Sequence, residues 1–106
     1  MLYLGSKRMF RQGDVLIERV ATIPRDASKL DHLVLAEGEL SGHAHRIAEP
    51  ETAELFNKHG VLFLAVNADH ATVVHDEHAP IALGRGNYRV WMQREYWPNR
   101  ISSAKD

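Results

Sequence analysis

The sequence predicts a single small all-β domain, a barrel or sandwich of roughly six to eight short strands. Apolar and β-branched residues gather in short runs, and turn residues separate these runs at intervals of about 8 to 12 residues. No amphipathic segment of helical period extends over about 12 residues. A chain of 106 residues has room for one core. We expect the domain to span residues 12–98, with a loose N-terminus at 1–11 and a frayed tail at 99–106.

Three strands are expected in the first half of the chain. Residues 15–20 form a β-branched run that closes before Pro24, because proline cannot continue a ladder of hydrogen bonds. Residues 33–36 form a short apolar strand that stops at a glutamate and a glycine. Residues 43–48 alternate, so a strand there places His43, His45 and Ile47 on one face.

The middle of the chain is compatible with two local structures. Residues 53–56 and 61–66 flank the polar stretch 57–60, which predicts a β-hairpin. The alternative is a helix over 51–59, preceded by a proline and stopped by Gly60. The hairpin is favoured because the flanking runs are short and apolar.

The second half of the chain predicts two further strands. Residues 71–74 form a short strand that is broken at 75–80, and residues 84–87 form a turn. The glycines of that turn begin like a dinucleotide-binding loop, but the third glycine is absent and a strand follows, so we interpret it as a hairpin turn. Residues 88–97 alternate over their whole length and predict the longest strand.

Charge and composition exclude several classes of protein. The 13 Lys and Arg residues are balanced by 14 Asp and Glu residues, so no bulk electrostatic field for nucleic acid or membranes is expected. The absence of cysteine excludes disulfides, thiolate metal sites and a cysteine nucleophile, and fits a reducing compartment. The first residues do not resemble a signal peptide and no apolar run reaches membrane-spanning length, so we expect a cytoplasmic protein.

Histidine is the residue type that points to chemistry, with seven copies in the chain. His43 and His45, two apart on one strand face, are placed to share one metal ion, because imidazole is the commonest transition-metal ligand in proteins. A third ligand is expected from His75 or His78, which lie beside a break in the chain. Glu49 and Glu77 are the candidate carboxylates. The other three histidines, in polar turns, are interpreted as structural: His32, His59 and His70.

Part of this pattern resembles the cupins, small metal-binding β-barrels in which a glycine precedes His-x-His and a glutamate follows. Gly38, His43, His45 and Glu49 stand close to that motif. The resemblance implies a cupin-like barrel with His43, His45 and Glu49 as metal ligands and His75 or His78 as the fourth. The second cupin motif, in which proline and glycine precede a histidine, has no counterpart in this sequence.

Several functions fit these residues. The leading interpretation is a domain that binds a divalent transition metal (zinc, iron, nickel or manganese) and leaves one position open for water or a small molecule, as in a metal-dependent hydrolase or oxygenase. The alternative enzyme is a metal-independent phosphodiesterase or ribonuclease, in which two histidines act as acid and base while Arg46 or Arg89 binds the phosphate as substrate. The third interpretation is a non-catalytic interaction module. In every case we expect a homodimer, because the strand that carries Trp91 and Trp97 protects an edge by pairing with a second copy.

A nucleic-acid or nucleotide partner is a weaker expectation. It rests on arginines interleaved with aromatic residues near the C-terminus, which are Arg85, Arg89, Arg94 and Arg100 with Tyr88, Trp91, Tyr96 and Trp97. Strand alternation places Arg89 and Arg94 on opposite faces, which does not favour one continuous stacking surface.

Overall fold

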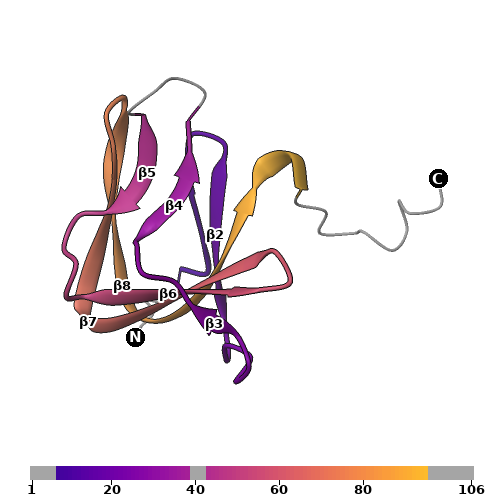
Figure 1. Cartoon of the computed structure of the whole chain (residues 1–106). Helices are drawn as coiled ribbons and strands as arrows, with labels where there is room; N and C mark the ends of the chain where they lie inside the picture. The colour runs from indigo at the N-terminus through magenta and orange to yellow at the C-terminus, as the bar shows by residue number, and fades with distance from the viewer. Residues whose placement is uncertain (1–6, 39–42, 96–106) are drawn as a thin grey trace.

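The computed structural model describes residues 7–38 and 43–95 and confirms the all-β class (Figure 1). The described residues form eight strands and one short 3₁₀ turn, Gln93–Glu95. In chain order the strands are β1 (Met9–Gln12), β2 (Val15–Val20), β3 (Ser28–Lys29), β4 (Val34–Glu37), β5 (Ala44–Ile47), β6 (Ala53–Lys58), β7 (Val61–His75) and β8 (His78–Met92).

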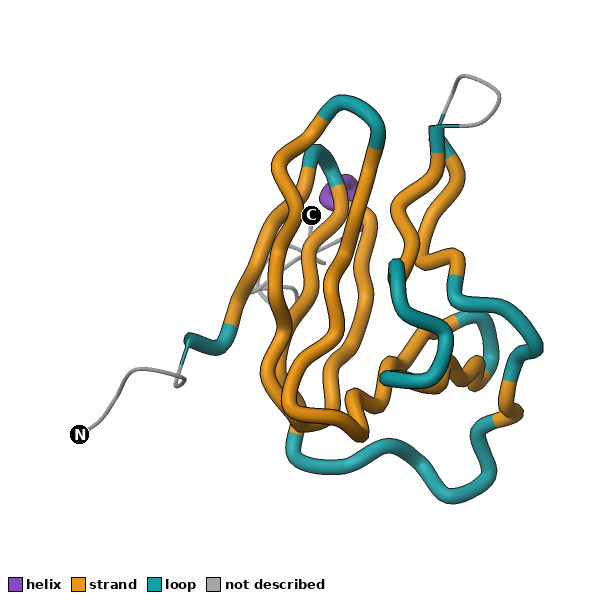
Figure 2. Tube along the Cα trace, turned by 90° about the vertical axis from the view of Figure 1, so that its left-hand side faces the viewer, coloured by secondary structure: helices purple, strands orange, loops and turns teal. Residues whose placement is uncertain are grey.

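The strands make one curled antiparallel sheet with the order β1-β2-β8-β7-β5-β4. Strand β8 pairs along one side of β7, whereas β6 pairs with the first part of the other side and β5 with the last part. In Figure 1, β6 runs across the base of the molecule, while β5 rises beside the upper part of β7 and β4 lies beside β5. This divergence at β7 curls the sheet into a half-barrel, whose strands are seen side by side in Figure 2.

The core lies on the concave face of the half-barrel. Inward-pointing residues of the longer strands are almost fully buried, among them Ile17, Leu55, Leu64 and Leu83. Burial of such a side chain stabilises the fold by about 1.5–3 kcal/mol. Tyr88 is fully buried among them, and its hydroxyl donates to the Gly84 carbonyl at 2.6 Å, so its polar atom has a partner.

The β6–β7 hairpin is confirmed, and the alternative helix over 51–59 is wrong. Lys58 pairs with Val61 across a two-residue turn, His59-Gly60. Both turn residues have positive φ, 51° at His59 and 83° at Gly60. This is the turn type that matches the twist of a hairpin, and it explains a histidine at position 59 without any role in chemistry.

The chain break expected over residues 75–80 is much shorter in the structure. The runs 61–66 and 71–74 belong to one strand, β7, which continues to His75. Only Asp76 and Glu77 separate β7 from β8, which begins at His78. The apolar pattern loses its period between the two runs because the pairing of β7 with β8 shifts register there.

The expected turn at 84–87 is also wrong, because these residues lie inside β8. The two glycines make room for the guanidinium group of Arg19. A Cβ at Gly86 would lie 2.7 Å from Arg19 Nη1, and one at Gly84 would lie 3.2 Å from Arg19 Nη2. The glycines therefore allow the Arg19 side chain to approach the backbone closely, which is a reason for glycine within a strand that does not involve a turn.

The ends of the domain differ in part from the expected boundaries. Strand β1 begins at Met9, ahead of the expected boundary at 12. Strand β8 stops at Met92, and the 3₁₀ turn takes the place of the next residues of the expected strand 88–97. Residues 1–6 and 96–106, including Trp97, lie outside the described residues. Within the described ranges no helix is long and apolar enough to cross a membrane.

Candidate metal centre

The predicted face of His43 and His45 is present in the structure. Within β5, His45 and Ile47 are buried while Arg46 between them is exposed, so the strand alternates as expected. His43 is half-buried and lies just before the strand. In Figure 1 the start of β5 lies at the same end of the half-barrel as the tip of the β7–β8 hairpin.

A β-bulge at that tip sets the direction of His78. Val73 pairs with Ile81, and His75 pairs with His78, so Ala79 and Pro80 of β8 lie opposite a single residue of β7. One extra residue reverses the alternation of a strand. His78 therefore faces the same side of the sheet as His75, and Pro80 occupies a bulge, where proline is tolerated.

Four imidazole rings consequently gather at one end of the half-barrel. The ring centroids of His45 and His75 are 4.3 Å apart, and those of His75 and His78 are 4.7 Å apart. The centroids of His45 and His78 are separated by 5.9 Å, and those of His43 and His75 by 6.0 Å. Two imidazoles bound to one tetrahedral zinc ion, at Zn–N distances of about 2.0–2.1 Å, have centroids about 5 Å apart. The observed spacings bracket that value.

His45 is the most deeply placed of the four. His45 is only 4% exposed, and its Nδ1 lies 2.8 Å from Oε1 of Gln12. Gln12 is also buried, at 2% exposed. Burial lowers the pKa of His45, and the neighbouring His75 and His78 lower it further, whereas Asp14 opposes them. The lowered pKa favours the neutral form of this side chain, which is the form that ligates metals.

Glu77, in the hairpin turn, contacts two of the other histidines. Its backbone N–H donates to Nδ1 of His75 at 3.0 Å. Its carboxylate oxygen Oε2 lies 3.5 Å from Nδ1 of His43. Glu77 thus orients His75 through its backbone N–H and His43 through its carboxylate.

The four rings border a cavity of about 440 Å³. Carboxylates also line it, so the surroundings of the imidazoles carry negative charge. The lining residues are Asp14, Glu37, Gly38, His43, His45, His75, Glu77, His78, Met92 and Arg94. Over residues 7–38 and 43–95, however, no three histidine, aspartate or glutamate side chains are already arranged so that they could hold a metal ion.

Comparison with known proteins places the chain in a family. Residues 11–93 match the family model described as Domain of unknown function (DUF8820). The chain belongs to this family. The DUF8820 match contains the four clustered histidines and both residues of the β7–β8 turn. No curated protein and no solved structure matches the chain.

Glu49 of this DUF8820 chain is not brought to the histidines. Both of its carboxylate oxygens accept hydrogen bonds from Thr72, from the backbone N–H at 2.9 Å and from the hydroxyl at 2.7 Å. These bonds hold the pKa of Glu49 below its usual value. The carboxylate therefore ties the segment after β5 to β7, and it does not line the cavity.

The two arginines expected to bind substrate also lie elsewhere. Arg46 is exposed on the side of β5 opposite to His45. The guanidinium carbon of Arg89 lies 3.4 Å from the ring centroid of Trp91, on β8. Arg94 is the arginine that lines the cavity. Tyr88, one of the expected stacking residues, is fully buried in the core.

Three residues where β1 meets β2 reach the site without having been predicted: Gln12, the last residue of β1, and the turn residues Gly13 and Asp14. Gly13 has a φ of +59°, and a Cβ there would lie 2.8 Å from His78 Nε2 and 3.4 Å from His45 Cε1. The glycine in this polar stretch marks a turn in the sequence, but only the closure of the sheet, with Gln12 bonded to β7 and β8, places that turn beside the histidines.

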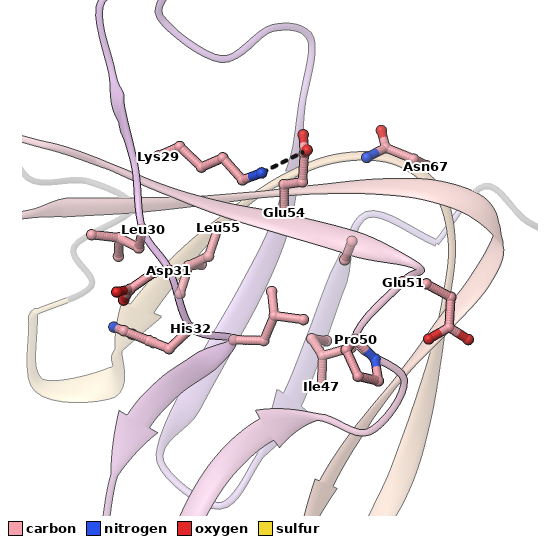
Figure 3. A pocket seen from close by; sticks show the side chains of 12 residues that line it. Lys29, Leu30, Asp31, His32, Ile47, Pro50, Glu51, Glu54, Leu55 and Asn67 are labelled. Atoms are coloured by element: carbon pink, nitrogen blue, oxygen red, sulfur yellow. Dashed lines mark ion pairs between the residues drawn. The ribbon is translucent and has the colours of Figure 1, made fainter.

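A second cavity of about 460 Å³ lies where β3 and β6 meet the ends of β4 and β5 (Figure 3). Lys29 and Glu54 form an exposed ion pair at 3.1 Å on its rim. His32 also lines it, and its Nδ1 accepts the backbone N–H of Val34 at 3.1 Å. His32 is therefore a turn residue, as expected, and the mixed charges do not point to one class of ligand.

Proposed function

We propose that this domain binds one divalent transition-metal ion at the end of the half-barrel, through His43, His45, His75 and His78. The observation that carries the proposal is the convergence of four imidazoles from two distant segments, at spacings close to those of histidines that share an ion. Zinc, iron, nickel and manganese all accept such nitrogen ligands.

The surroundings of the rings support a cation. Asp14, Glu37 and Glu77 line the same cavity and offset its positive charge. Burial lowers the pKa of His45, which favours the neutral form that binds a metal. The chain has a core of its own, so the ion serves function and is not needed for folding.

Binding requires rotation of side chains, because the donor nitrogens do not yet meet at one point. His78 is exposed and His43 is half-buried, so both rings have space to turn. His75 is less prepared, since its Nδ1 accepts the Glu77 N–H and neutral His75 then carries its proton on Nε2. We expect replacement of His75 to weaken binding less than replacement of His45.

A tetrahedral metal held by three of the histidines keeps one position for water or a small ligand, and an ion held by all four keeps one only if it takes five or six ligands. An open position is the chemistry of metal-dependent hydrolases and oxygenases. The cupin-like reading of the fold is compatible with such a site. In such a site the carboxylate beside the metal would come from Asp14, Glu37 or Glu77, which border the cavity, and not from Glu49.

The test is metal analysis of untagged protein, followed by calorimetric titration with zinc, iron(II), nickel and manganese at micromolar concentrations. His43→Ala and His45→Ala are expected to abolish stoichiometric binding, and His78→Ala to weaken it strongly. His59→Ala and His32→Ala, both in turns, are the controls and should bind as the parent protein does. Absence of uptake of all four metals by the parent protein would refute the proposal.

One observation favours a second candidate, a metal-independent acid/base pair acting on a phosphodiester. His45 presents its Nδ1 to a side-chain oxygen, whereas His75 accepts a backbone N–H at the same atom, so these two neighbouring rings differ in the nitrogen that carries the proton. The Nε2 of His45 can then accept a proton as a base, whereas the Nε2–H of His75 can donate a hydrogen bond to the phosphate. Arg94 would neutralise the phosphate. Hydrolysis of bis(4-nitrophenyl) phosphate in the presence of a chelator, lost in both His45→Ala and His75→Ala, would support this reading; activity that needs added metal would exclude it.

A further inference from the structure

We propose that Gln12 is a positioning residue that fixes the proton of His45 on Nδ1 and thereby reserves Nε2 for a ligand in the cavity. The part of this proposal that concerns metal affinity rests on the proposed function, whereas the part that concerns the proton does not.

The orientation of the Gln12 amide follows from its hydrogen bonds. Its Nε2 donates to the carbonyl of Val73 at 3.1 Å and to the carbonyl of Ala79 at 2.9 Å. Carbonyl oxygens only accept, so both N–H groups of the amide must lie on that side. The amide oxygen therefore faces His45, and the 2.8 Å contact with Nδ1 requires the imidazole to be the donor.

This arrangement determines the chemistry of the ring. A neutral imidazole carries one proton, and the hydrogen bond at one nitrogen sets the state of the other. With the proton on Nδ1, the lone pair of His45 is on Nε2, the nitrogen that points away from Gln12. A buried oxygen acceptor on the second nitrogen is the usual support of a metal-bound histidine.

The support is rigid because it joins four strands. Gln12 belongs to β1, its two acceptors belong to β7 and β8, and His45 belongs to β5. Ala79 accepts from within the bulge that also directs His78. Both side chains of the contact are at most 4% exposed, so water does not compete for the Nδ1 proton.

The proton is located by ¹⁵N-detected long-range NMR spectra of the metal-free protein at about pH 8, where histidine is neutral. The expected spectrum shows His45 protonated at Nδ1, although histidine in water favours Nε2. Gln12→Met should move the proton to Nε2. The matched control is Gln93→Met, which removes the amide of the chain's other glutamine, a partner of Arg11, and should leave His45 unchanged.

The second measurement is zinc affinity, which should fall about 10- to 100-fold in Gln12→Met and stay unchanged in Gln93→Met. A parent spectrum with the proton on Nε2, or a Gln12→Met spectrum that keeps it on Nδ1, overturns the role of Gln12. The parent spectrum decides this even if Gln12→Met does not fold. A proton on Nδ1 in a protein that takes up no metal leaves the role of Gln12 intact and refutes the proposed function.

Discussion

Replacing Gly13 by alanine should damage the histidine cluster more than it damages the fold, and Gly60 provides the comparison. Both glycines adopt the left-handed conformation, with φ of +59° and +83°. An L-residue in that conformation costs about 1–2 kcal/mol. Gly13→Ala and Gly60→Ala should therefore each lower the free energy of unfolding by about 1–2 kcal/mol, and each kcal/mol lowers Tm by about 4–8 °C in a domain of this size.

The two positions differ in what a new methyl group meets. At Gly13 it would lie 2.8 Å from Nε2 of His78, whereas at Gly60 no atom lies within 4 Å. His78 is exposed, so its ring moves aside and the backbone does not have to shift. The additional cost in stability is small, but the moved atom belongs to a proposed ligand. Zinc affinity should fall by about tenfold or more in Gly13→Ala, the scale of a positioning defect at a metal site.

Urea unfolding measures the first effect, and calorimetric titration with zinc measures the second. We expect Gly13→Ala and Gly60→Ala to lose about the same stability, and only Gly13→Ala to lose zinc affinity. The reasoning fails if Gly13→Ala binds zinc as tightly as the parent protein, or if Gly60→Ala loses as much affinity as Gly13→Ala.

Three further outcomes are expected. Because burial lowers the pKa of His45, the unfolded chain takes up a proton at higher pH than the folded chain does. The free energy of unfolding of the metal-free protein should therefore fall as the pH drops below about 6.5. In urea titrations across that range, a His45→Gln variant should show a shallower fall. Glu49→Gln should lower the urea midpoint by weakening the bonds to Thr72 and leave zinc stoichiometry unchanged, whereas loss of zinc would restore Glu49 as a ligand. The homodimer expected from the sequence loses its stated reason, because β8, which carries Trp91, pairs with β2 and β7 and is not an edge strand. Sedimentation equilibrium tests the homodimer: twice the chain mass of 12.0 kDa supports it, and a monomer mass at high micromolar concentration would contradict it.

Local periodicity was sufficient for the features that depend on one segment. The alternation of residues 43–48 placed His43 and His45 on the face of Ile47, and the structure buries His45 and Ile47 together. The β6–β7 hairpin was predicted from two apolar runs and a polar turn between them. In both cases the pleat of a single strand, or one tight turn, decides the outcome.

Features set by pairing between strands were not predictable in the same way. The local sequence of the β7–β8 hairpin tip does not show that β8 carries one residue more than β7 there. This bulge nevertheless decides which way His78 points. Glu49 follows His45 at a suggestive spacing, but its carboxylate is taken by Thr72 of β7. Gln12 reaches His45 from β1, more than thirty residues away. Such contacts depend on the register of the whole sheet.

The tight turn Asp76-Glu77 has a consequence for the unfolded chain. It separates His75 from His78 by only two residues, and His43 is similarly close to His45. In the proposed metal site each pair would chelate the ion with little loss of chain entropy, so the unfolded protein is expected to retain some affinity for metal. Folding would join two weak bidentate halves and raise the effective concentration of one for the other. Stabilisation by metal in a denaturation experiment should therefore be smaller than the affinity of the folded protein implies.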